Sequence, residues 1–597
     1  MAAQFAVGID LGTTNSVISY IPLEAEVPKA QLILVPQLVA QSTVEELTGL
    51  PSFLYLAPDF EAKANADSLP WKEDTGCVSG EWARRKSAEV PDRTVGAAKS
   101  WLCYSKVDRH EPILPWNAPE EVEKVSPVTA SARFLRHLVE AWNQAFPDAP
   151  LEEQNVTLTV PASFDASARD LTREAAMVAG LPSDLTLLEE PQAALYAWLE
   201  EQGDAWRESL KVGDRILVCD VGGGTTDLTL IQVDQQEGDL ELTRASVGRH
   251  LLVGGDNMDL ALAYHASTEF QSKGMDLDPW QSVSLWHSCR SAKESLLGDT
   301  APDQFTITVK KRGSKLIGGT ESIQLSGKSA VDLLLEGFFP KCELSEVPQA
   351  AVASGFQELG LPYEADTAIT RHVAAFLNRQ MTEGSDTQLP THILFNGGVF
   401  KADALRTRML ETIKSWAPNA RLEELQGDRD LDHAVSRGAA YYGWTKVKGG
   451  VRIRGGTARS YYIGIESAGL AIPGAPRPLH ALCVVPFGIE EGTDVEVPSR
   501  EIGLVVGQPA RFRFFSSVDR PSDAAGHLID RWDGEELVET DSLETTLKAE
   551  SLNDDTFLPV RFHSKVTELG VLELWCQSVK TPDKWKLEFN VREEANS

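Results

Sequence analysis

One short pattern occurs twice in this chain of 597 residues. It reads DLGTTNSVISY from Asp10 to Tyr20 and DVGGGTTDLTL from Asp220 to Leu230. Each copy has an aspartate at the end of an apolar run, a glycine turn, two threonines, and residues that alternate toward a second strand. Two copies in matching strand contexts favour a duplicated fold, in which two lobes face each other across a cleft.

The residue types in this repeat suit the binding of phosphate groups. Glycines let backbone N–H groups approach phosphate oxygens closely, and threonine hydroxyls add hydrogen-bond donors. An aspartate at the strand end can hold Mg²⁺ through the water molecules that this ion retains. A single hairpin of this kind is as often only a turn. Two copies predict that each lobe contributes one hairpin to the same triphosphate and its metal ion.

Apolar runs alternate with helical stretches from residue 5 to about residue 445. The runs FAVGID, NVTLTVPASF, DRILVCDVGGG and THILFNGGV are short and rich in Val, Ile and Leu, as buried strands are. Between them, SARFLRHLVEAWNQAF and DASARDLTREAAMVAGL have apolar residues at helical spacing. The alternation predicts an α/β domain with mixed sheets and covering helices over residues 1–445.

The pattern changes after residue 445. The stretch TKVKGGVRIRGGTARS holds four glycines and five basic residues without an acid, and we interpret residues 446–457 as an interdomain linker. A flexible linker is favoured over a segment that lies against an acidic surface of this chain or of a partner. The apolar period then becomes two, as in DKWKLEFNVRE, which predicts a small antiparallel β-domain over residues 458–597.

Composition argues against several classes of function. Asp and Glu number 88 against 56 Lys and Arg, a net charge of −32, so we expect no nucleic-acid or membrane partner. The seven cysteines are scattered without a C-x-x-C pair, which fits a reducing compartment rather than zinc or disulfides. No apolar run reaches the roughly 18 residues of a membrane span, and the N-terminus lacks the pattern of a signal peptide. We therefore expect a cytoplasmic protein.

Four motifs resemble those of one protein family. GIDLGTTNS (8–16), LEEPQAALYAW (188–198), DVGGGTTD (220–227) and LFNGGV (394–399) are similar to motifs of the actin-like ATPase superfamily, most of all its DnaK-type branch of 70-kDa heat-shock chaperones. The resemblance covers about residues 1–445 and continues loosely beyond them. It implies a duplicated, ribonuclease H-like nucleotide-binding domain in two lobes, followed by a β-sandwich. It also implies ATP or ADP, Mg²⁺ and K⁺ as ligands, and slow ATP hydrolysis.

The resemblance, carried over position by position, implies a set of site residues. Lys99 would position the attacking water and the γ-phosphate, with Glu190, Asp10, Asp220 and Thr225 as further catalytic residues, and Asp10, Asp220 and Glu190 would hold the metal. The residues implied for nucleotide binding are Gly12, Thr13, Thr14, Gly222, Gly223, Gly224, Thr225, Asp227, Gly254, Gly255, Lys293, Gly397, Gly398 and Asp432. Phosphoryl transfer to water needs mainly positioning and charge neutralisation, which such residues can supply.

Plainer interpretations stand beside these roles. Lys99 could be a solvated helix lysine, and Glu190 a carboxylate at a helix start before a proline. Arg290 stands where the family usually has glutamate, Leu297 where serine is usual, and Lys401 where arginine is usual. These departures concern adenine binding, and a solvated helix face is the alternative for Arg290 and its neighbour Lys293.

Other positions concern communication between the domains. Pro161 and Arg169 match the family's proline switch and arginine relay, whereas Ser163 replaces the tyrosine expected near that switch. The family's leucine-rich linker is glycine-rich and basic here. Only a few polar residues follow Val591, so we expect no helical lid, and a bound peptide should leave quickly.

Three functions stay open at this point. The first is a divergent DnaK-type chaperone that couples slow ATP hydrolysis to binding of unfolded polypeptide or a dedicated client, with a co-chaperone and a nucleotide exchange factor as further partners. The second keeps the nucleotide switch but makes the β-domain a recruitment module for one partner protein. The third is a small-molecule kinase of the same superfamily, against which the chaperone-like motifs and the β-domain both argue.

Overall fold

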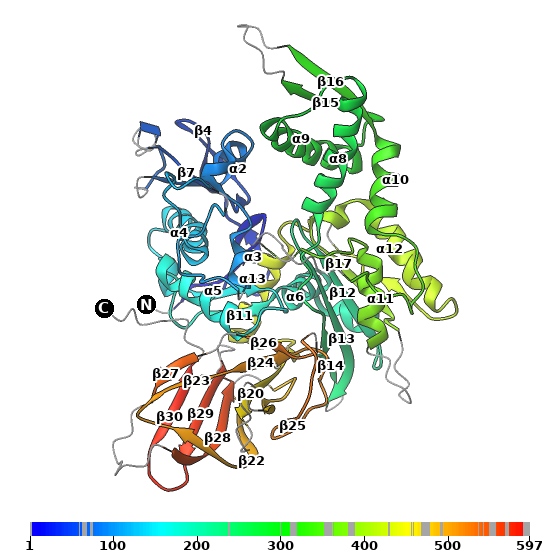
Figure 1. Cartoon of the computed structure of the whole chain (residues 1–597). Coiled ribbons are helices and arrows are strands. Elements are labelled where there is room, and N and C mark those ends of the chain that lie inside the picture. Colours follow the sequence, from blue (N-terminus) through cyan, green and yellow to red (C-terminus); the bar gives the residue numbers. More distant parts are fainter. Residues whose placement is uncertain are drawn as a thin grey trace.

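The computed structural model of the chain describes most of its length, and Figure 1 shows how the elements are arranged. The described residues are 3–58, 60–61, 68–71, 76–104, 106–116, 118–236, 239–298, 300–310, 319–350, 361, 363–379, 389–427, 430–454, 457, 459–466, 478–489, 493–534, 536–540, 543–547, 557–566 and 572–588. Among these residues, no helix is both long and apolar enough to cross a membrane.

The first lobe is built around a sheet in the order β11-β10-β1-β2-β3, with β6 also paired to β2. Strand β1 runs parallel to β10 and antiparallel to β2. Its strands are β1 (Phe5–Leu11), β2 (Asn15–Pro22), β3 (Gln31–Leu32), β4 (Val35–Ala40), β5 (Thr43–Leu47), β6 (Leu50–Pro51), β7 (Leu54–Leu56), β8 (Cys77–Ser79), β9 (Thr94–Val95), β10 (Asn155–Val160) and β11 (Thr186–Glu189). Its helices are α2 (Glu81–Ser87), α3 (Ala98–Leu102), α4 (Pro127–Ala145) and α5 (Ala166–Ala179).

The second lobe repeats this plan, with a sheet in the order β18-β17-β12-β13-β14-β19. Strand β12 runs antiparallel to β13 and parallel to β17, as β1 does to β2 and β10. Its strands are β12 (Arg215–Val221), β13 (Thr226–Gln236), β14 (Asp239–Val247), β15 (Gln304–Lys310), β16 (Thr320–Ser326), β17 (His392–Asn396), β18 (Glu423–Glu424) and β19 (Ile453–Arg454). Its helices are α8 (Gly255–Ser272), α9 (Pro279–Leu297), α10 (Gly327–Phe338), α11 (Ile369–Arg379) and α12 (Asp403–Trp416). The observed repeat agrees with the duplication expected from the two motifs.

Two helices join the lobes near the centre of the molecule (Figure 1). Helix α6 (Glu190–Gln202) follows β11, short α7 (Trp206–Ser209) follows α6, and α13 (Ala434–Lys448) packs against both α6 and β1. A side chain at Gly8 would overlap the backbone of α13, and one at Gly438 would overlap the backbone of α6. Glycine is therefore required at both positions, because the helices and the strand approach so closely.

The segment expected as a flexible linker has defined structure in its described part. Residues 446–448 are the last turn of α13, and Ile453–Arg454 form β19, which pairs in parallel with β14. The amide of Ile453 also donates to the hydroxyl oxygen of Tyr196 at 2.8 Å. The interpretation of these residues as a flexible linker was wrong. The sequence does not reveal that α13 extends to residue 448, nor that the edge of β14 pairs with Ile453 and Arg454.

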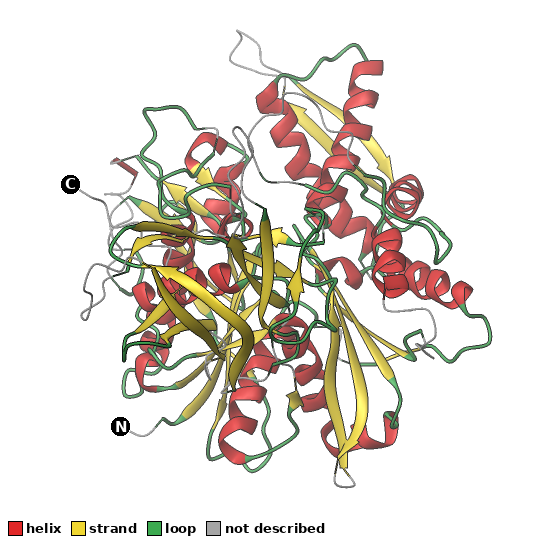
Figure 2. Cartoon of the chain, turned by 60° about the horizontal axis from the view of Figure 1, so that its bottom comes forward, coloured by secondary structure: helices red, strands yellow, loops and turns green. Residues whose placement is uncertain are grey.

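Two antiparallel sheets contain most of the described residues after residue 459. Their orders are β25-β21-β20-β24-β26 and β22-β28-β29-β30, and the pair β23-β27 is separate. The strands are β20 (Ser460–Glu466), β21 (Leu479–Val485), β22 (Asp494–Val505), β23 (Pro509–Phe512), β24 (Phe514–Ser517), β25 (Leu528–Ile529), β26 (Val538–Glu539), β27 (Leu543–Thr546), β28 (Phe557–Val566), β29 (Leu572–Ser578) and β30 (Lys584–Glu588). Seen from this end, strands dominate the foreground (Figure 2).

Apolar side chains from both of these sheets form one core. Ile463 of β20, Val484 of β21, Phe562 of β28 and Leu574 of β29 all belong to it. Trp585 and Leu587 are buried as their alternation predicts, while Phe589 and Val591 lie outside the described residues. The described residues from 459 to 588 contain no helix.

Candidate functional site

The turns of the two repeated hairpins meet each other between the lobes. The amide of Gly222 donates to the carbonyl oxygen of Thr225 at 2.9 Å and closes the second turn. A side chain on Gly223 would overlap the Thr14 hydroxyl, and one on Gly224 would lie 3.2 Å from the Thr13 methyl group. The predicted phosphate-binding residues of both hairpins therefore lie together, and glycine makes their contact possible.

Lys99 lies among carboxylates rather than in solvent. It is on α3, is only 7 % exposed, and forms an ion pair with Glu190 at the start of α6. Burial raises the pKa of Glu190 to about 8, against the lowering effect of Lys99 and with added effects of Asp10 and Asp220. This pairing excludes the interpretation of Lys99 as a solvated helix lysine.

The two repeated aspartates end β1 and β12 and contribute to the same electrostatic field. Burial raises the pKa of Asp10, opposed by Lys99 and by the Thr159 hydroxyl, which donates to Asp10 at 3.0 Å. Burial also raises the pKa of Asp220 to about 7, and the nearby carboxylates of Asp227 and Asp10 add to it. The site thus holds more negative charge than Lys99 neutralises, which favours a bound cation.

The carboxyl groups of Asp10, Asp220 and Glu190 are candidates for holding Mg²⁺. No three His, Cys, Asp or Glu side chains among the described residues converge closely enough to clasp an ion directly. Mg²⁺ keeps most of its water ligands, so carboxylates that face it across those waters suffice. Asp10, Asp220 and Glu190 fit such an outer arrangement, because a nearby cation would favour the charged carboxylates that burial disfavours, and would also offset the repulsion among the carboxylates that adds to the pKa of Asp220 and Glu190.

Asn396 is a site residue that the motif analysis missed. It ends β17, is 3 % exposed, and donates its Nδ2 to Asp220 Oδ2 at 2.7 Å. The next residue, Gly397, has φ 85°, and a side chain there would lie 2.6 Å from Asp220 Oδ1. The polar residue just before the double glycine of LFNGGV was the available signal.

Asp227 is held by two residues that sequence reasoning did not place beside it. The Ser163 hydroxyl donates to Asp227 at 2.6 Å and lies 2.8 Å from His250 Nδ1, which is 3.4 Å from Asp227. Burial opposes ionisation of Asp227, but His250 and Ser163 hold its pKa below the usual value. Burial also opposes protonation of His250, whose pKa is nevertheless raised to about 10 by Cys103 and Asp227.

The start of α8 lies against the second hairpin. The amide of Gly255 donates to the Gly222 carbonyl oxygen at 3.0 Å, and a side chain on Gly254 would lie 2.7 Å from that same oxygen. Lys293 donates to the Gly255 carbonyl oxygen at 2.8 Å and pairs with Asp259 at 2.7 Å. These contacts attach three of the predicted nucleotide residues to the hairpin pair.

Arg290 forms ion pairs where the family usually has glutamate. It contacts Asp256 at 2.6 Å and Asp259 at 2.8 Å, so its charge is balanced within the lobe. Burial raises the pKa of Asp259, although Lys293 and Arg290 lower it. Leu297 packs at the edge of the second-lobe core. A solvated helix face is thereby excluded for Arg290 and Lys293.

The remaining predicted positions, Gly398 and Asp432, lie near each other, Gly398 just after β17 and Asp432 just before α13. Lys401 forms an ion pair with Asp432, and a side chain on Gly398 would lie 3.7 Å from Asp432 Oδ1. The Lys401 and Asp432 side chains are half exposed. The structure therefore connects every predicted site residue to the hairpins, either directly or through β17 and α8.

A second ion-pair cluster lies next to the acidic one. Glu189, which precedes Glu190, pairs with Arg169 at 2.7 Å and with buried Arg244. Burial opposes its ionisation, but Arg244 and Arg169 hold the pKa of Glu189 below the usual value. Arg169, predicted as part of a relay, thus links α5 of the first lobe to β14 of the second.

The β-domain contacts the two lobes at two described points. Arg459 donates to the backbone carbonyl oxygen of Ser163, whose hydroxyl holds Asp227. Arg379 at the end of α11 pairs with Asp519 at 2.9 Å. Ser163 therefore contacts the β-domain through its backbone and the candidate site through its side chain.

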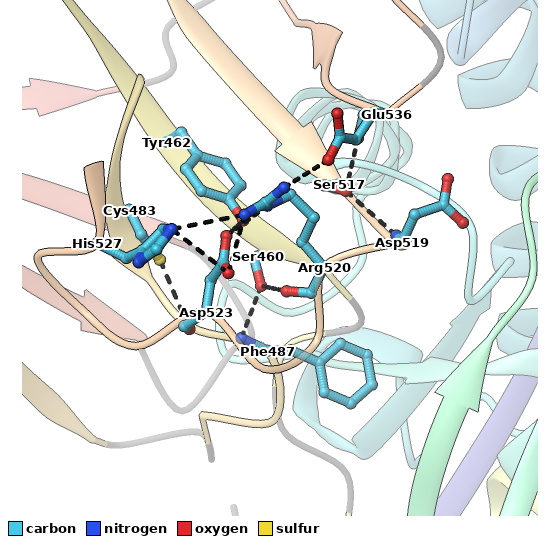
Figure 3. A network of polar contacts seen from close by, with 10 residues as sticks. All are labelled: Ser460, Tyr462, Cys483, Phe487, Ser517, Asp519, Arg520, Asp523, His527 and Glu536. Carbon is cyan, nitrogen blue, oxygen red and sulfur yellow. Dashed lines mark hydrogen bonds and ion pairs between the residues drawn. The ribbon is translucent and has the colours of Figure 1, made fainter. Parts of the chain in front are cut away.

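A polar network holds the segment that carries Asp519 (Figure 3). Arg520 pairs with Asp523 at 2.6 Å and with Glu536. The Tyr462 hydroxyl donates to Asp523 at 2.8 Å, and the Ser460 hydroxyl donates to the Arg520 carbonyl oxygen at 2.9 Å. The segment is thus fixed to β20, the first strand after the junction.

Comparisons with known proteins find similarity to Hsp70-type proteins. The family described as Hsp70 protein matches residues 74–317. A "Chaperone protein HscA homolog" of Shewanella sp. (strain MR-7) is 28 % identical over 350 residues, covering 57 % of this chain and 48 % of the relative. A protein of the same name from Shewanella sediminis (strain HAW-EB3) is 28 % identical over 404 residues, covering 59 % and 57 %. The chain spans about half the length of the curated relatives it matches.

Proposed function

Because this chain is a member of the Hsp70-type family, at low identity to its relatives, we propose that it is an ATP-dependent chaperone. Residues 1–445 would bind and hydrolyse ATP slowly, and the β-domain would bind an unfolded polypeptide or a dedicated client. The observation that carries the proposal is the contact between the two hairpin turns beside the Lys99–Glu190 pair.

The chain's own residues suggest how hydrolysis would proceed. Backbone amides of the two turns and the hydroxyls of Thr13, Thr14 and Thr225 would bind the phosphate oxygens. Lys99 would orient the γ-phosphate and the attacking water, and Glu190, in the carboxylate form that its ion pair with Lys99 favours, would accept a proton from that water. A bound Mg²⁺, held through water by Asp10, Asp220 and Glu190, would neutralise phosphate charge.

The contacts at Ser163 support communication between the β-domain and this site. Movement of the β-domain would pull on the Ser163 carbonyl through Arg459, and the Ser163 hydroxyl would transmit it to Asp227. The pairing of β19 with β14 and the Arg169–Glu189–Arg244 cluster lie along the same junction. Ser163 would then serve in the place where the family uses a tyrosine.

Single-turnover ATP hydrolysis, with and without an unfolded polypeptide, tests the proposal. We expect slow hydrolysis that the polypeptide accelerates, and a loss of about a hundredfold or more in Lys99→Ala with nucleotide binding retained. If the polypeptide does not change the rate of hydrolysis, the second function is favoured, in which the β-domain recruits one partner protein. Absence of nucleotide binding in the unmodified protein would contradict both.

A further inference from the structure

A cavity lies next to Asn396, the residue that donates a hydrogen bond to Asp220. It is separate from the residues that the two hairpins bring together. It is lined by α6, the end of β17, the segment after β18, and α13, with Arg406 reaching it from α12. Helices α6 and α13 pack against each other beside it, near the centre of the molecule (Figure 1). Among the described lining residues, none belongs to the set predicted to bind nucleotide or metal.

Two buried polar atoms in this lining have no hydrogen-bond partner within the described part of the chain. Asn396 uses its Nδ2 to hold Asp220, which leaves its Oδ1 without a donor. Arg406 pairs with Asp403, and its Nη1 lies 3.6 Å from Glu424, but its Nε has no acceptor. Buried polar atoms are destabilising when unpaired, so each unpaired atom in a cavity marks a place for a partner.

Size and charge narrow the choice of that partner. The cavity has a volume of about 60 Å³, which leaves room only for a small ligand or a few water molecules, since one water needs about 10–15 Å³ on the same measure. The described lining includes the carboxyl groups of Glu201, Glu424 and Asp430 but only the guanidinium groups of Arg406 and Arg437. The excess of negative charge disfavours an anion such as a phosphate.

We propose that this cavity is a binding site for a small neutral heterocycle or amide, which donates an N–H group to Asn396 Oδ1 and accepts a hydrogen bond from Arg406 Nε. The indole of Trp198 and the side chains of Ala197 and Leu394 supply apolar surface for a flat ring. Binding here does not depend on the proposed ATPase activity, although the ligand contacts the residue that holds Asp220.

Uracil is a suitable probe, because it presents N–H donors beside carbonyl acceptors on a flat ring. Its binding to the full chain is measured by saturation-transfer NMR and calorimetry, with and without ADP and Mg²⁺. We expect uracil to bind in both conditions, and 1,3-dimethyluracil, which has no N–H donor, to bind at least about tenfold more weakly. Inorganic phosphate should not compete with uracil.

Matched variants test the assignment to this cavity. Arg406→Lys keeps the positive charge but removes the Nε–H group, and should weaken uracil binding about tenfold. Arg408→Lys changes an arginine of the same helix that does not line the cavity, and should leave binding unchanged. Ala197→Leu fills the cavity from α6 and should also prevent binding, with thermal melts confirming that each variant folds.

Three results would overturn the proposal. The first is no uracil binding, and the second is equal binding of uracil and its dimethyl derivative. The third is binding that neither Arg406→Lys nor Ala197→Leu weakens. A crystal structure grown with uracil that shows only ordered water beside Asn396 and Arg406 would also contradict it, since water would then be the missing partner.

Discussion

The two repeated hairpins share one backbone plan but differ in the residues that hold their aspartates. Asp10 lies beside β10 and receives a hydroxyl hydrogen bond from Thr159 at 3.0 Å. Asp220 lies beside β17 and receives an amide hydrogen bond from Asn396 at 2.7 Å. The second hairpin also carries Asp227, which pairs across the strands with Asp220 and is held by Ser163 and His250.

This difference shows how a duplicated motif acquires unequal roles. The second turn contacts both Thr14 of the first turn and the start of α8, and three consecutive glycines make those contacts possible. The first turn has a single glycine, Gly12, and it approaches the second turn through Thr13 and Thr14. The first lobe thus provides a simple turn to the candidate site, while the second provides a turn that also contacts the rest of its lobe and, through the contact of Asp227 with Ser163, the junction.

The largest effect should come from removing the repeated charges. Asp10→Asn and Asp220→Asn should each slow single-turnover ATP hydrolysis about a hundredfold or more, because under the proposed function both would serve one nucleotide and one cation. The double variant should be only slightly slower than the worse single variant, because residues that act together are not additive. Fully additive losses would mean that the hairpins serve separate sites.

A smaller effect should follow when the contact between the turns is disturbed. In Gly223→Ala the new methyl group would overlap the Thr14 hydroxyl, so the turns must separate and ADP binding should weaken about tenfold. Gly222→Ala is the matched control, since its methyl group would lie 3.7 Å from the nearest atom. Adding Thr14→Ala to Gly223→Ala should restore part of the affinity for ADP, as measured by calorimetry. If the affinity does not recover, overlap with Thr14 is not the cause of the weaker binding.

The pH dependence of ATP hydrolysis allows a direct comparison of Asn396 and Thr159, which donate hydrogen bonds to the two repeated aspartates. Asn396→Leu removes a donor that lowers the pKa of Asp220, so that pKa should rise above its present value of about 7. The acid limb of the hydrolysis profile should then move to higher pH, with a several-fold loss at pH 7. Thr159→Val should move the limb in the same direction but less, because Lys99 lowers the pKa of Asp10 more than the Thr159 hydroxyl does. If both substitutions shift the acid limb of the pH profile equally, the two hairpins do not differ in how strongly their aspartates are held.

The smallest effect concerns stability without nucleotide or metal. Glu190 binds its proton more tightly in the folded chain, with a pKa of about 8 against an ordinary 4.5. Between these values the folded state holds more protons, so stability should fall as pH rises from about 4.5 to 8. Thermal melts in EDTA should show a decline of a few degrees, which Glu190→Gln should reduce. The exposed substitution Glu208→Gln should leave the decline unchanged.

Local patterns predicted many of the residues that lie together in the candidate site. Asp10, Thr13 and Thr14, and the glycines from Gly222 to Gly224, follow from residue types within one turn, and Lys99 and Glu190 follow from a family resemblance. Their convergence depends on the packing of α6 and α13 between the lobes. The contacts of Asn396, Ser163 and His250 with the aspartates escaped prediction, because each joins residues at least 23 positions apart, beyond the reach of any local pattern.

The linker shows why local composition misled. Glycines and basic residues indicate a solvated, flexible chain, yet Ile453 is buried and forms part of β19. The hydrogen bonds that overcome the local preference come from β14 and from the hydroxyl of Tyr196. Neither partner is near in sequence.

By itself, the sequence determined the period of each element, the glycine turns and the repeated aspartates, because these depend on residues a few positions apart. It also determined the net charge of −32, which argues against polyanionic partners. Only the tertiary structure decided which donor holds each aspartate, how Lys99 is paired, and which buried atoms stay unpaired. Those outcomes depend on burial and on contacts between distant segments, which raise or lower a pKa only once the chain has folded.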